Sequence, residues 1–252
     1  MALLQSPVMG LASGGQARSG RAGAPPRREQ AVPFAPGEVL TYDISWSSYL
    51  TAGTAIVSVK EKKPSYGSTA YYIVAEGRPT PLLAKLYSLY YKADTLLDSY
   101  TLLPQRGSIY SDENGRHRMK VTEFDQAARK ARYEVRTATL VQNQLTVPAY
   151  VQDALSALYV IRTLGLKPGE KVTMPICDNG KAFKVQFQAG AIERVATATG
   201  TVQALKIVPT VVGPGPSLGR GVAIWISTDA RRVPVRLESA LAVGQFVLVL
   251  RH

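Results

Sequence analysis

The side chains that most often carry catalysis or hold metals are scarce in this sequence. It contains one cysteine, Cys177, and two histidines, His117 and His252. A single cysteine excludes an intrachain disulfide and a zinc site built from several cysteines, and two histidines leave too few ligands for a histidine metal centre. Cys177 lies at the end of a strand pattern and is interpreted as a small core residue. The sequence therefore predicts no catalytic residue, no metal ligand and no cofactor.

The acidic residues occur singly, and no spacing marks two of them as partners. Two facing carboxylates could act as acid and base on a glycosidic bond. The single aspartates instead fall in strand or turn patterns, at positions 43, 94, 98, 125 and 229. Asp153 lies near the start of a predicted helix, where the helix dipole favours a negative charge. A catalytic role is therefore less well supported than a binding role.

One segment interrupts a sequence that otherwise has strand periodicity. Residues 151–164, VQDALSALYVIRTL, contain neither glycine nor proline, and Gly165 and Pro168 end the pattern. At about 100° per residue the segment predicts a helix with one apolar stripe. The stripe is formed by Val151, Ala154, Leu155, Leu158, Tyr159 and Ile161.

Arg162 falls in the middle of that apolar stripe. An unpaired buried guanidinium would cost several kcal/mol, so three interpretations stay open. The side chain reaches solvent or the carbonyls at the helix end, it pairs with a carboxylate on the sheet, or it binds a ligand. The carboxylates considered for the ion pair are Asp43, Asp229 and Glu238.

From residue 33 onward the hydrophobic period is two, which predicts β-strands. Turn residues separate the strands, including Asn114-Gly115 and Asp178-Asn179-Gly180. Residues 82–87 predict a short helical turn. No helix lies between successive strands, so a parallel sheet is excluded. The predicted fold is mainly β: about a dozen short strands form an antiparallel meander curled into a barrel or half-barrel, and the helix at about 151–164 packs on its concave face. Strands are predicted at 39–46, 54–60, 71–76, 90–97, 118–124, 132–137, 171–176, 182–188, 192–198, 202–208, 222–227, 233–238 and 245–250, with another between Pro104 and Asp112.

The predicted domain organisation is a single β-rich domain over residues 34–252, preceded by a different kind of segment. Residues 1–33 are rich in proline, glycine and arginine and are interpreted as a disordered leader or the remnant of a signal region. No stretch approaches the roughly 20 apolar residues of a membrane-spanning helix. The protein is therefore expected to be peripheral to a membrane at most.

The chain is strongly basic, with 30 Lys plus Arg against 18 Asp plus Glu and a formal net charge of +12. The basic residues are scattered over several predicted turns, whereas nucleic-acid surfaces concentrate charge beside aromatic residues. No specific nucleic-acid partner is predicted. Attraction to anionic envelope polymers or lipid head groups fits this charge distribution at least as well.

Four segments together resemble a known family. They are FAPGEVLTYDISW, VQDALSALYVIRTLGLKPGE, TGTVQALKIVP and AIWISTDARRVPVRLE. From Phe34 to Leu250 the sequence is similar to the bacterial exported family called Domain of Unknown Function 3108. The resemblance implies a periplasmic or secreted location and supplies no activity to transfer. With the pattern analysis it leaves these structural or ligand-binding candidates: Arg162, Asp43, Asp229, Arg232, Tyr159, Trp46 and Trp225.

These observations favour a binding protein of the cell envelope. We expect a non-catalytic binder or carrier of an amphiphilic or hydrophobic ligand, with a lipid, a lipoprotein or an envelope glycan as partner. Two alternatives remain: a docking or structural envelope protein, and a glycan-acting enzyme that uses a carboxylate pair. The sequence does not predict the oligomeric state.

Overall fold

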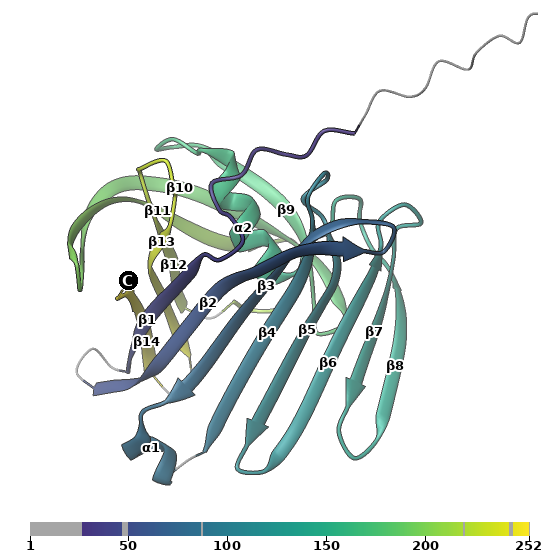
Figure 1. The fold of residues 1–252 in the computed structure, drawn as a ribbon, viewed down its shortest axis with the longest axis horizontal. Coiled ribbons are helices and arrows are strands. Elements are labelled where there is room, and N and C mark those ends of the chain that lie inside the picture. The colour runs from purple at the N-terminus through teal and green to yellow at the C-terminus, as the bar shows by residue number, and fades with distance from the viewer. Residues whose placement is uncertain (1–26, 47–49, 87, 219, 242–243, 252) are drawn as a thin grey trace, which may run out of the picture.

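The alternation of apolar and polar residues produces one antiparallel sheet of 14 strands among the residues that the computed structural model describes (Figure 1). The structure describes residues 27–46, 50–86, 88–218, 220–241 and 244–251. The strands are β1 (Val39–Trp46), β2 (Leu50–Ser65), β3 (Ser68–Pro79), β4 (Leu89–Asp98), β5 (Pro104–Glu113), β6 (Arg116–Asp125), β7 (Lys130–Arg136), β8 (Leu140–Thr146), β9 (Lys171–Asp178), β10 (Lys181–Thr197), β11 (Gly200–Val212), β12 (Arg220–Ser227), β13 (Pro234–Leu241) and β14 (Gly244–Leu250). The helices are α1 (Pro81–Leu86) and α2 (Ala154–Leu164).

The sheet is a meander in which the first and last strands pair. Its order is β8-β7-β6-β5-β4-β3-β2-β1-β14-β13-β12-β11-β10-β9, and all the paired strands are antiparallel. The β1–β14 pair joins the two halves, so β8 and β9 form the two edges of the described sheet. The predicted fold class, an antiparallel meander curled into a barrel or half-barrel, is confirmed in its unclosed form.

The observed strands differ from the predicted ones in two places. The predicted strands 182–188 and 192–198 form one strand, β10, with an irregularity in its pairing to β11 between Ala189 and Ile192. The prediction of only short strands is therefore wrong here, because a bulge bends a strand without ending it. No strand was predicted at β8, whose residues are mostly exposed and lack the alternation of a half-buried strand.

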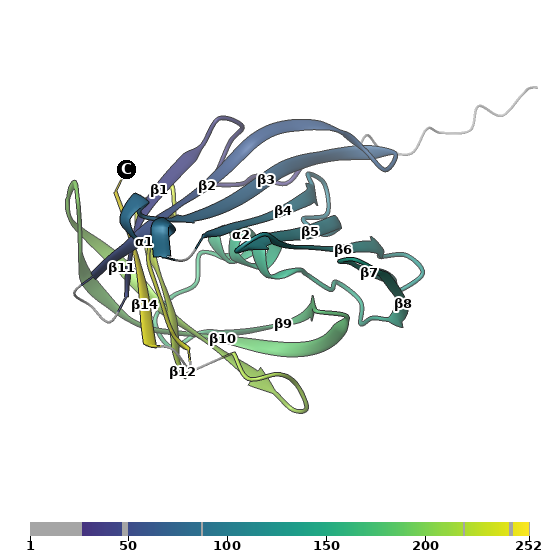
Figure 2. The same ribbon diagram turned by 90° about the horizontal axis from the view of Figure 1, so that it is seen from below.

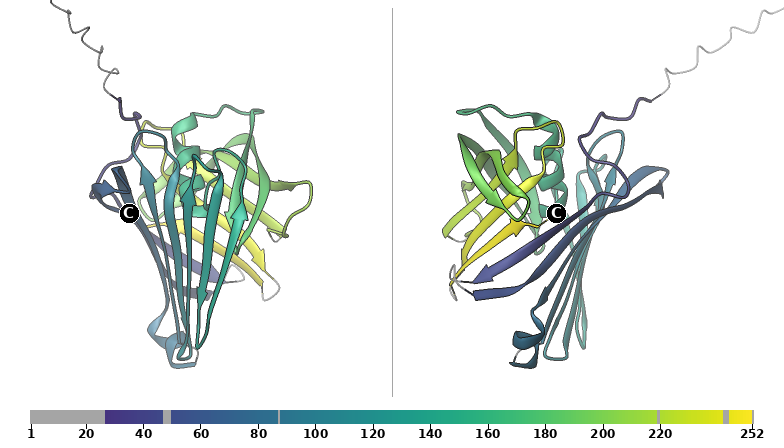
Figure 3. Two further views of the ribbon diagram at one scale, coloured as in Figure 1. Left: turned by 90° about the vertical axis from the view of Figure 1, so that its right-hand side faces the viewer. Right: turned by 60° about the vertical axis from the view of Figure 1, so that its left-hand side comes forward.

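The two halves of the sheet incline toward each other and enclose α2 between them (Figures 2 and 3). On one side, Ala157 and Ile161 pack with residues of β9 to β12, including Met174 and Ile207. On the other side, Tyr159 packs against a cluster that includes Ile73 and Leu97 of β3 and β4. The predicted position of the helix on the concave face is therefore confirmed.

The helix begins three residues later than predicted because Gln152 pairs with a strand and Asp153 caps the helix. Gln152 forms a bridge with Ile176 of β9. Asp153 is the N-cap: its carboxylate accepts the Ser156 N–H, and the Ser156 hydroxyl accepts the Asp153 N–H. This reciprocal capping satisfies backbone donors that the start of a helix leaves unpaired. Gly165, at φ 58°, ends the helix in the left-handed conformation.

The segment before β1 lies against the sheet and α2 (Figure 1). The Glu29 carboxylate accepts hydrogen bonds from Lys62 and Ser99, and Phe34 is buried. Residues 1–26 of the predicted leader lie outside the described residues. The division of the chain at residue 34 stays a prediction.

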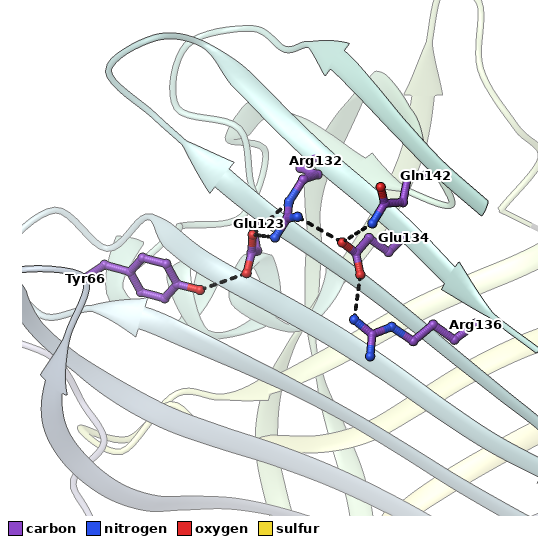
Figure 4. A network of polar contacts seen from close by, with 6 residues as sticks. All are labelled: Tyr66, Glu123, Arg132, Glu134, Arg136 and Gln142. Carbon is purple, nitrogen blue, oxygen red and sulfur yellow. Dashed lines mark hydrogen bonds and ion pairs between the residues drawn. The ribbon is translucent and has the colours of Figure 1, made fainter. Parts of the chain in front are cut away.

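The outer face of β6 to β8 carries a network of ionic contacts (Figure 4). Glu134 is 5% exposed, and its carboxylate contacts Arg132 at 3.1 Å, Arg136 at 3.0 Å and Gln142 at 2.9 Å. Arg132 also binds Glu123, which accepts a hydrogen bond from Tyr66. The network therefore links the edge strand β8 to the strands behind it.

Replacing Glu134 by glutamine is expected to lower the free energy of unfolding by about 1 kcal/mol, because two arginines lose their shared carboxylate while remaining solvated. The loss should shrink in 0.5 M salt, which screens exposed charges. Urea denaturation at low and high salt measures both effects. An equal loss at the two salt concentrations would show that charge is not what Glu134 contributes.

Candidate ligand-binding cleft

Arg162 is fully buried and forms a bidentate ion pair with Glu38. Its Nη1 lies 2.7 Å from Oε1 of Glu38, and its Nη2 lies 2.8 Å from Oε2. The Arg162 side chain is 0% exposed and that of Glu38 is 9% exposed. Two further donors of the guanidinium bind the backbone oxygens of Arg232 and Arg231, at 3.0 and 3.2 Å. A buried charge is tolerated when it is paired and hydrogen-bonded in this way.

Two aromatic rings complete the surroundings of the guanidinium. Its central carbon lies 5.3 Å from the ring centre of Phe34 and 4.9 Å from that of Tyr159. The two rings meet edge to face, with centres 4.8 Å apart. Burial raises the pKa of Tyr159 far above its usual range, which keeps its hydroxyl neutral. The two rings therefore stabilise the buried positive charge of Arg162.

The turn between β12 and β13 holds the end of α2. Asp229 accepts the backbone N–H groups of Arg231 and Arg232. The Arg232 side chain donates to the carbonyl oxygens of Arg162 and Thr163, the last turn of the helix. We call the group of Phe34, Glu38, Tyr159, Arg162 and Arg232 the Arg162 clamp. It fixes α2 to both halves of the sheet.

Below the clamp, one side of α2 faces a cleft. A cavity of about 250 Å³ lies between the helix and the β4–β7 wall, and one of about 230 Å³ lies between the helix and the β9–β12 wall. Both are lined by Ala154, Leu158 and Asp178, so they adjoin along the helix. The β4–β7 wall contributes Tyr91, Ala93, Ile109, Thr122 and Tyr133 to the lining; the opposite wall contributes Phe183, Val185, Phe187 and Ile224.

The polar groups of the cleft gather where the turn between β9 and β10 approaches β6 and β7. Lys120 donates a hydrogen bond to the side-chain oxygen of Asn179, across the gap between the two halves. Gly180 has φ 69°, and a Cβ atom there would lie 2.7 Å from the ring of Tyr133. Only glycine permits this close approach without strain. The cleft thus combines apolar walls with a lysine, an aspartate and an amide at one end.

Burial raises the pKa values of four groups that line the cleft: Tyr91, Tyr133, Asp153 and Cys177. Burial raises the pKa of Asp153 to about 6, although its carboxylate accepts hydrogen bonds from Ser156 N–H and the Thr95 hydroxyl. Burial also raises the pKa of the Cys177 thiol to about 11. Cys177 is 3% exposed and packs with Phe124 and Val151, so its interpretation as a core residue is confirmed.

The comparisons with known proteins agree with the geometry of the fold. A family model described as "Protein of unknown function (DUF3108)" matches residues 41–251. The chain belongs to the DUF3108 family. Arg162, Asp229 and Arg232 lie within the matched residues, whereas Glu38, the ion-pair partner of Arg162, lies just before them. No curated protein matches the chain.

Two solved structures are similar to this chain at low sequence identity. A β-barrel-like protein of the family DUF1849 from Brucella abortus is 9% identical, with a TM-score of 0.53, over 84% of this chain and 94% of that chain. A "putative exported protein with YmcC-like fold" from Bacteroides fragilis is 13% identical, with a TM-score of 0.35, over 89% and 99%. The first likeness shows that the DUF3108 chain has a β-barrel-like fold.

The carboxylates proposed as partners of Arg162 were wrong. Asp43 pairs with Arg251, Glu238 with Arg236, and Asp229 binds the backbone of its own turn. Glu38, the observed partner, precedes β1 and lies outside the alternating strand pattern, so alternation does not identify it as a sheet carboxylate. Arg232, and not Arg162, binds the carbonyls at the helix end.

The two tryptophans lie away from the cleft as the structure describes it. Trp225 is 4% exposed; its ring nitrogen donates to Glu193, and Lys206 and Arg236 lie over its ring. Trp46 is 39% exposed at the end of β1. Of the seven candidate residues, Arg162, Arg232 and Tyr159 come together at the clamp, while Asp229 positions Arg232.

Sequence reasoning missed most residues of the cleft. The sequence pattern places Leu158 in the apolar stripe and Asn179 in a turn, and neither position by itself indicates a site. Lys120 gave no signal, because it was one of many scattered basic residues. The one sequence feature that points to this end of the cleft is the predicted turn at 178–180. Its Gly180 allows the turn to approach the ring of Tyr133, which is distant in sequence.

Proposed function

We propose that this protein binds a hydrophobic or amphiphilic small molecule of the cell envelope, such as a lipid, in the cleft beneath α2, and that it acts as a binder or carrier. The observation that carries the proposal is that the sheet buries one side of α2 and leaves the side facing the cavities partly exposed. Ala157, Tyr159 and Ile161 are buried by the sheet, whereas Leu158 is partly exposed and Ala154 is exposed toward the two cavities.

The cleft has the composition expected for such a ligand. Binding pockets are mostly apolar, with a few polar groups that fix the orientation of the ligand. An apolar body would lie along Leu158 and Phe183, and a polar end would lie near Lys120 and Asp178. Together, the two adjoining cavities of about 250 and 230 Å³ fall in the lower part of the range typical of small-molecule sites, roughly 300–1,000 Å³.

The envelope location rests on the family resemblance. In the described residues, no helix has the length and apolar character needed to cross a membrane. The net charge of +12 would attract the chain to anionic head groups, which is compatible with collecting an amphiphile at a membrane surface.

A fluorescence titration with N-phenyl-1-naphthylamine, an apolar dye that brightens in dry pockets, tests the proposal. The wild-type protein should bind the dye saturably, and palmitate should displace it. Ala154→Trp should weaken binding at least tenfold, because the indole would occupy the space shared by both cavities. Ala196→Trp, at an exposed position on β10 outside the cleft, should bind like the wild type.

Native mass spectrometry of gently purified protein gives a second readout: a bound molecule of lipid mass is expected in the wild type and reduced in Ala154→Trp. Absence of saturable dye binding, or equal binding by the wild type and Ala154→Trp, would refute the proposed site.

A further inference from the structure

The two edge strands of the sheet, β8 and β9, differ in how well they are protected against pairing with a strand of another molecule. A free strand edge exposes unpaired N–H and C=O groups, and proteins block such edges with proline, charged residues or covering segments. On β9, Pro175 lacks an N–H, and Lys171 and Asp178 are charged. Gln152 also covers this edge, with its N–H donating to Pro175 and its carbonyl accepting from Cys177.

The opposite edge, β8, has none of these protections in the part of the chain that the structure describes. Its sequence, LVQNQLT, contains no charged residue and no proline. Leu140 and Val141 are 53% and 60% exposed, and every residue of the strand except Leu145 is exposed. The strand has β7 as its one neighbour and lies at the border of the sheet (Figure 1).

The sequence of β8 is also nearly palindromic about Asn143. If two copies pair antiparallel around this residue, Gln142 faces Gln144 of the other copy and Val141 faces Leu145 of the other copy. Amide then meets amide and aliphatic meets aliphatic, and such cross-strand pairs stabilise sheets. No charged residue lies opposite a like charge within the paired strands, which matters for a chain of net charge +12.

We propose that β8 is a self-association edge, through which two copies of this chain pair by antiparallel β8–β8 strand addition with a two-fold axis at Asn143. A contact of this kind is isologous, so it closes at a dimer and does not propagate. The register of β8 on β7 places Val141, Asn143 and Leu145 on one face of the strand and Gln142 and Gln144 on the other. The dimer would join two sheets into one.

Analytical ultracentrifugation of the full chain tests this proposal. The wild type is expected to be a dimer at high micromolar concentration, and association should strengthen with salt, because salt screens the repulsion between two basic molecules. Asn143→Lys and Asn143→Glu each place like charges opposite one another, so each variant should be monomeric. An equimolar mixture of the two should form heterodimers, since lysine then faces glutamate.

A crosslinking experiment tests the register. Asn143→Cys should form an intermolecular disulfide on mild oxidation, because residues directly opposite in an antiparallel pair have suitable Cα separations. Thr173→Cys, at an exposed position of the protected edge strand β9, should not crosslink. The native Cys177 is buried and does not interfere. A monomeric wild type, or a dimer unaffected by Asn143→Lys, would overturn the proposal.

Discussion

Replacing Arg162 by methionine is expected to lower the free energy of unfolding by about 3–5 kcal/mol, the range measured when one partner of a buried ion pair is removed. The reason is that the Glu38 carboxylate, 9% exposed, would be left without its cation. Two backbone carbonyls of the β12–β13 turn would also lose their donors. Urea denaturation followed by circular dichroism measures the loss.

Arg251→Met provides the matched control. It breaks an ion pair with Asp43 in which both side chains are about two-fifths exposed, so the expected loss is below about 1 kcal/mol. If Arg162→Met proves too unstable to purify, the double variant Glu38→Leu with Arg162→Met should fold better, because it leaves no unpaired charge. Equal losses for Arg162→Met and Arg251→Met would contradict the role assigned to the clamp.

Asp153→Asn is expected to change how stability depends on pH. The folded-state pKa of Asp153, about 6, lies above the value of about 3.9 in an unfolded chain. The folded protein therefore binds the proton more tightly, and the stability that this group contributes is present below pH 4 and lost as pH rises through 6. The difference of about two pKa units corresponds to about 3 kcal/mol.

The measurement is the free energy of unfolding of both proteins at pH 4, 5, 6 and 7. Relative to Asp153→Asn, the wild type should lose about 2 kcal/mol across this range, mostly between pH 4 and 6. Asparagine caps helices as well as aspartate, so the helix itself should persist; Asp153→Ala should cost about 1 kcal/mol more at every pH. A difference that rises with pH would show that the fold favours the charged carboxylate.

Much of the architecture could be predicted because it depends on local patterns. Period-two alternation identified most strands, and the absence of helices between them excluded parallel pairing. The apolar stripe of residues 151–164 predicted a helix that must be covered, and Arg162 within it indicated a charge that must reach solvent, pair with a carboxylate or bind a ligand. Strand β8 could not be predicted from alternation, because it pairs with β7 through backbone hydrogen bonds and has no buried face.

The site depended on contacts that no local pattern contains. Glu38 and Arg162 are 124 residues apart, and Lys120 and Asn179 are 59 apart. Alternation indicates which side chains face the hollow, but it does not show which of them the helix leaves uncovered. The cleft exists because α2 fills one part of the hollow and its clamp holds it there.

The clamp and the cleft are therefore parts of one arrangement. The Arg162 clamp attaches one side and the C-terminal end of α2 to the sheet, so the other side keeps a fixed position above the cavities. A binding site formed on rigid elements needs less ordering when the ligand arrives. The clamp residues thus hold α2 in place above the proposed site without lining its two cavities.

Hydrogen–deuterium exchange with and without palmitate tests the central claim most directly. Binding in the cleft should slow exchange in peptides that contain α2 and in those from the β9–β10 hairpin, while the outer network around Glu134 should exchange unchanged. Palmitate that leaves the exchange of α2 and the hairpin unaltered, under conditions where it displaces the dye, would place the binding site elsewhere and contradict the cleft as the functional centre of this protein.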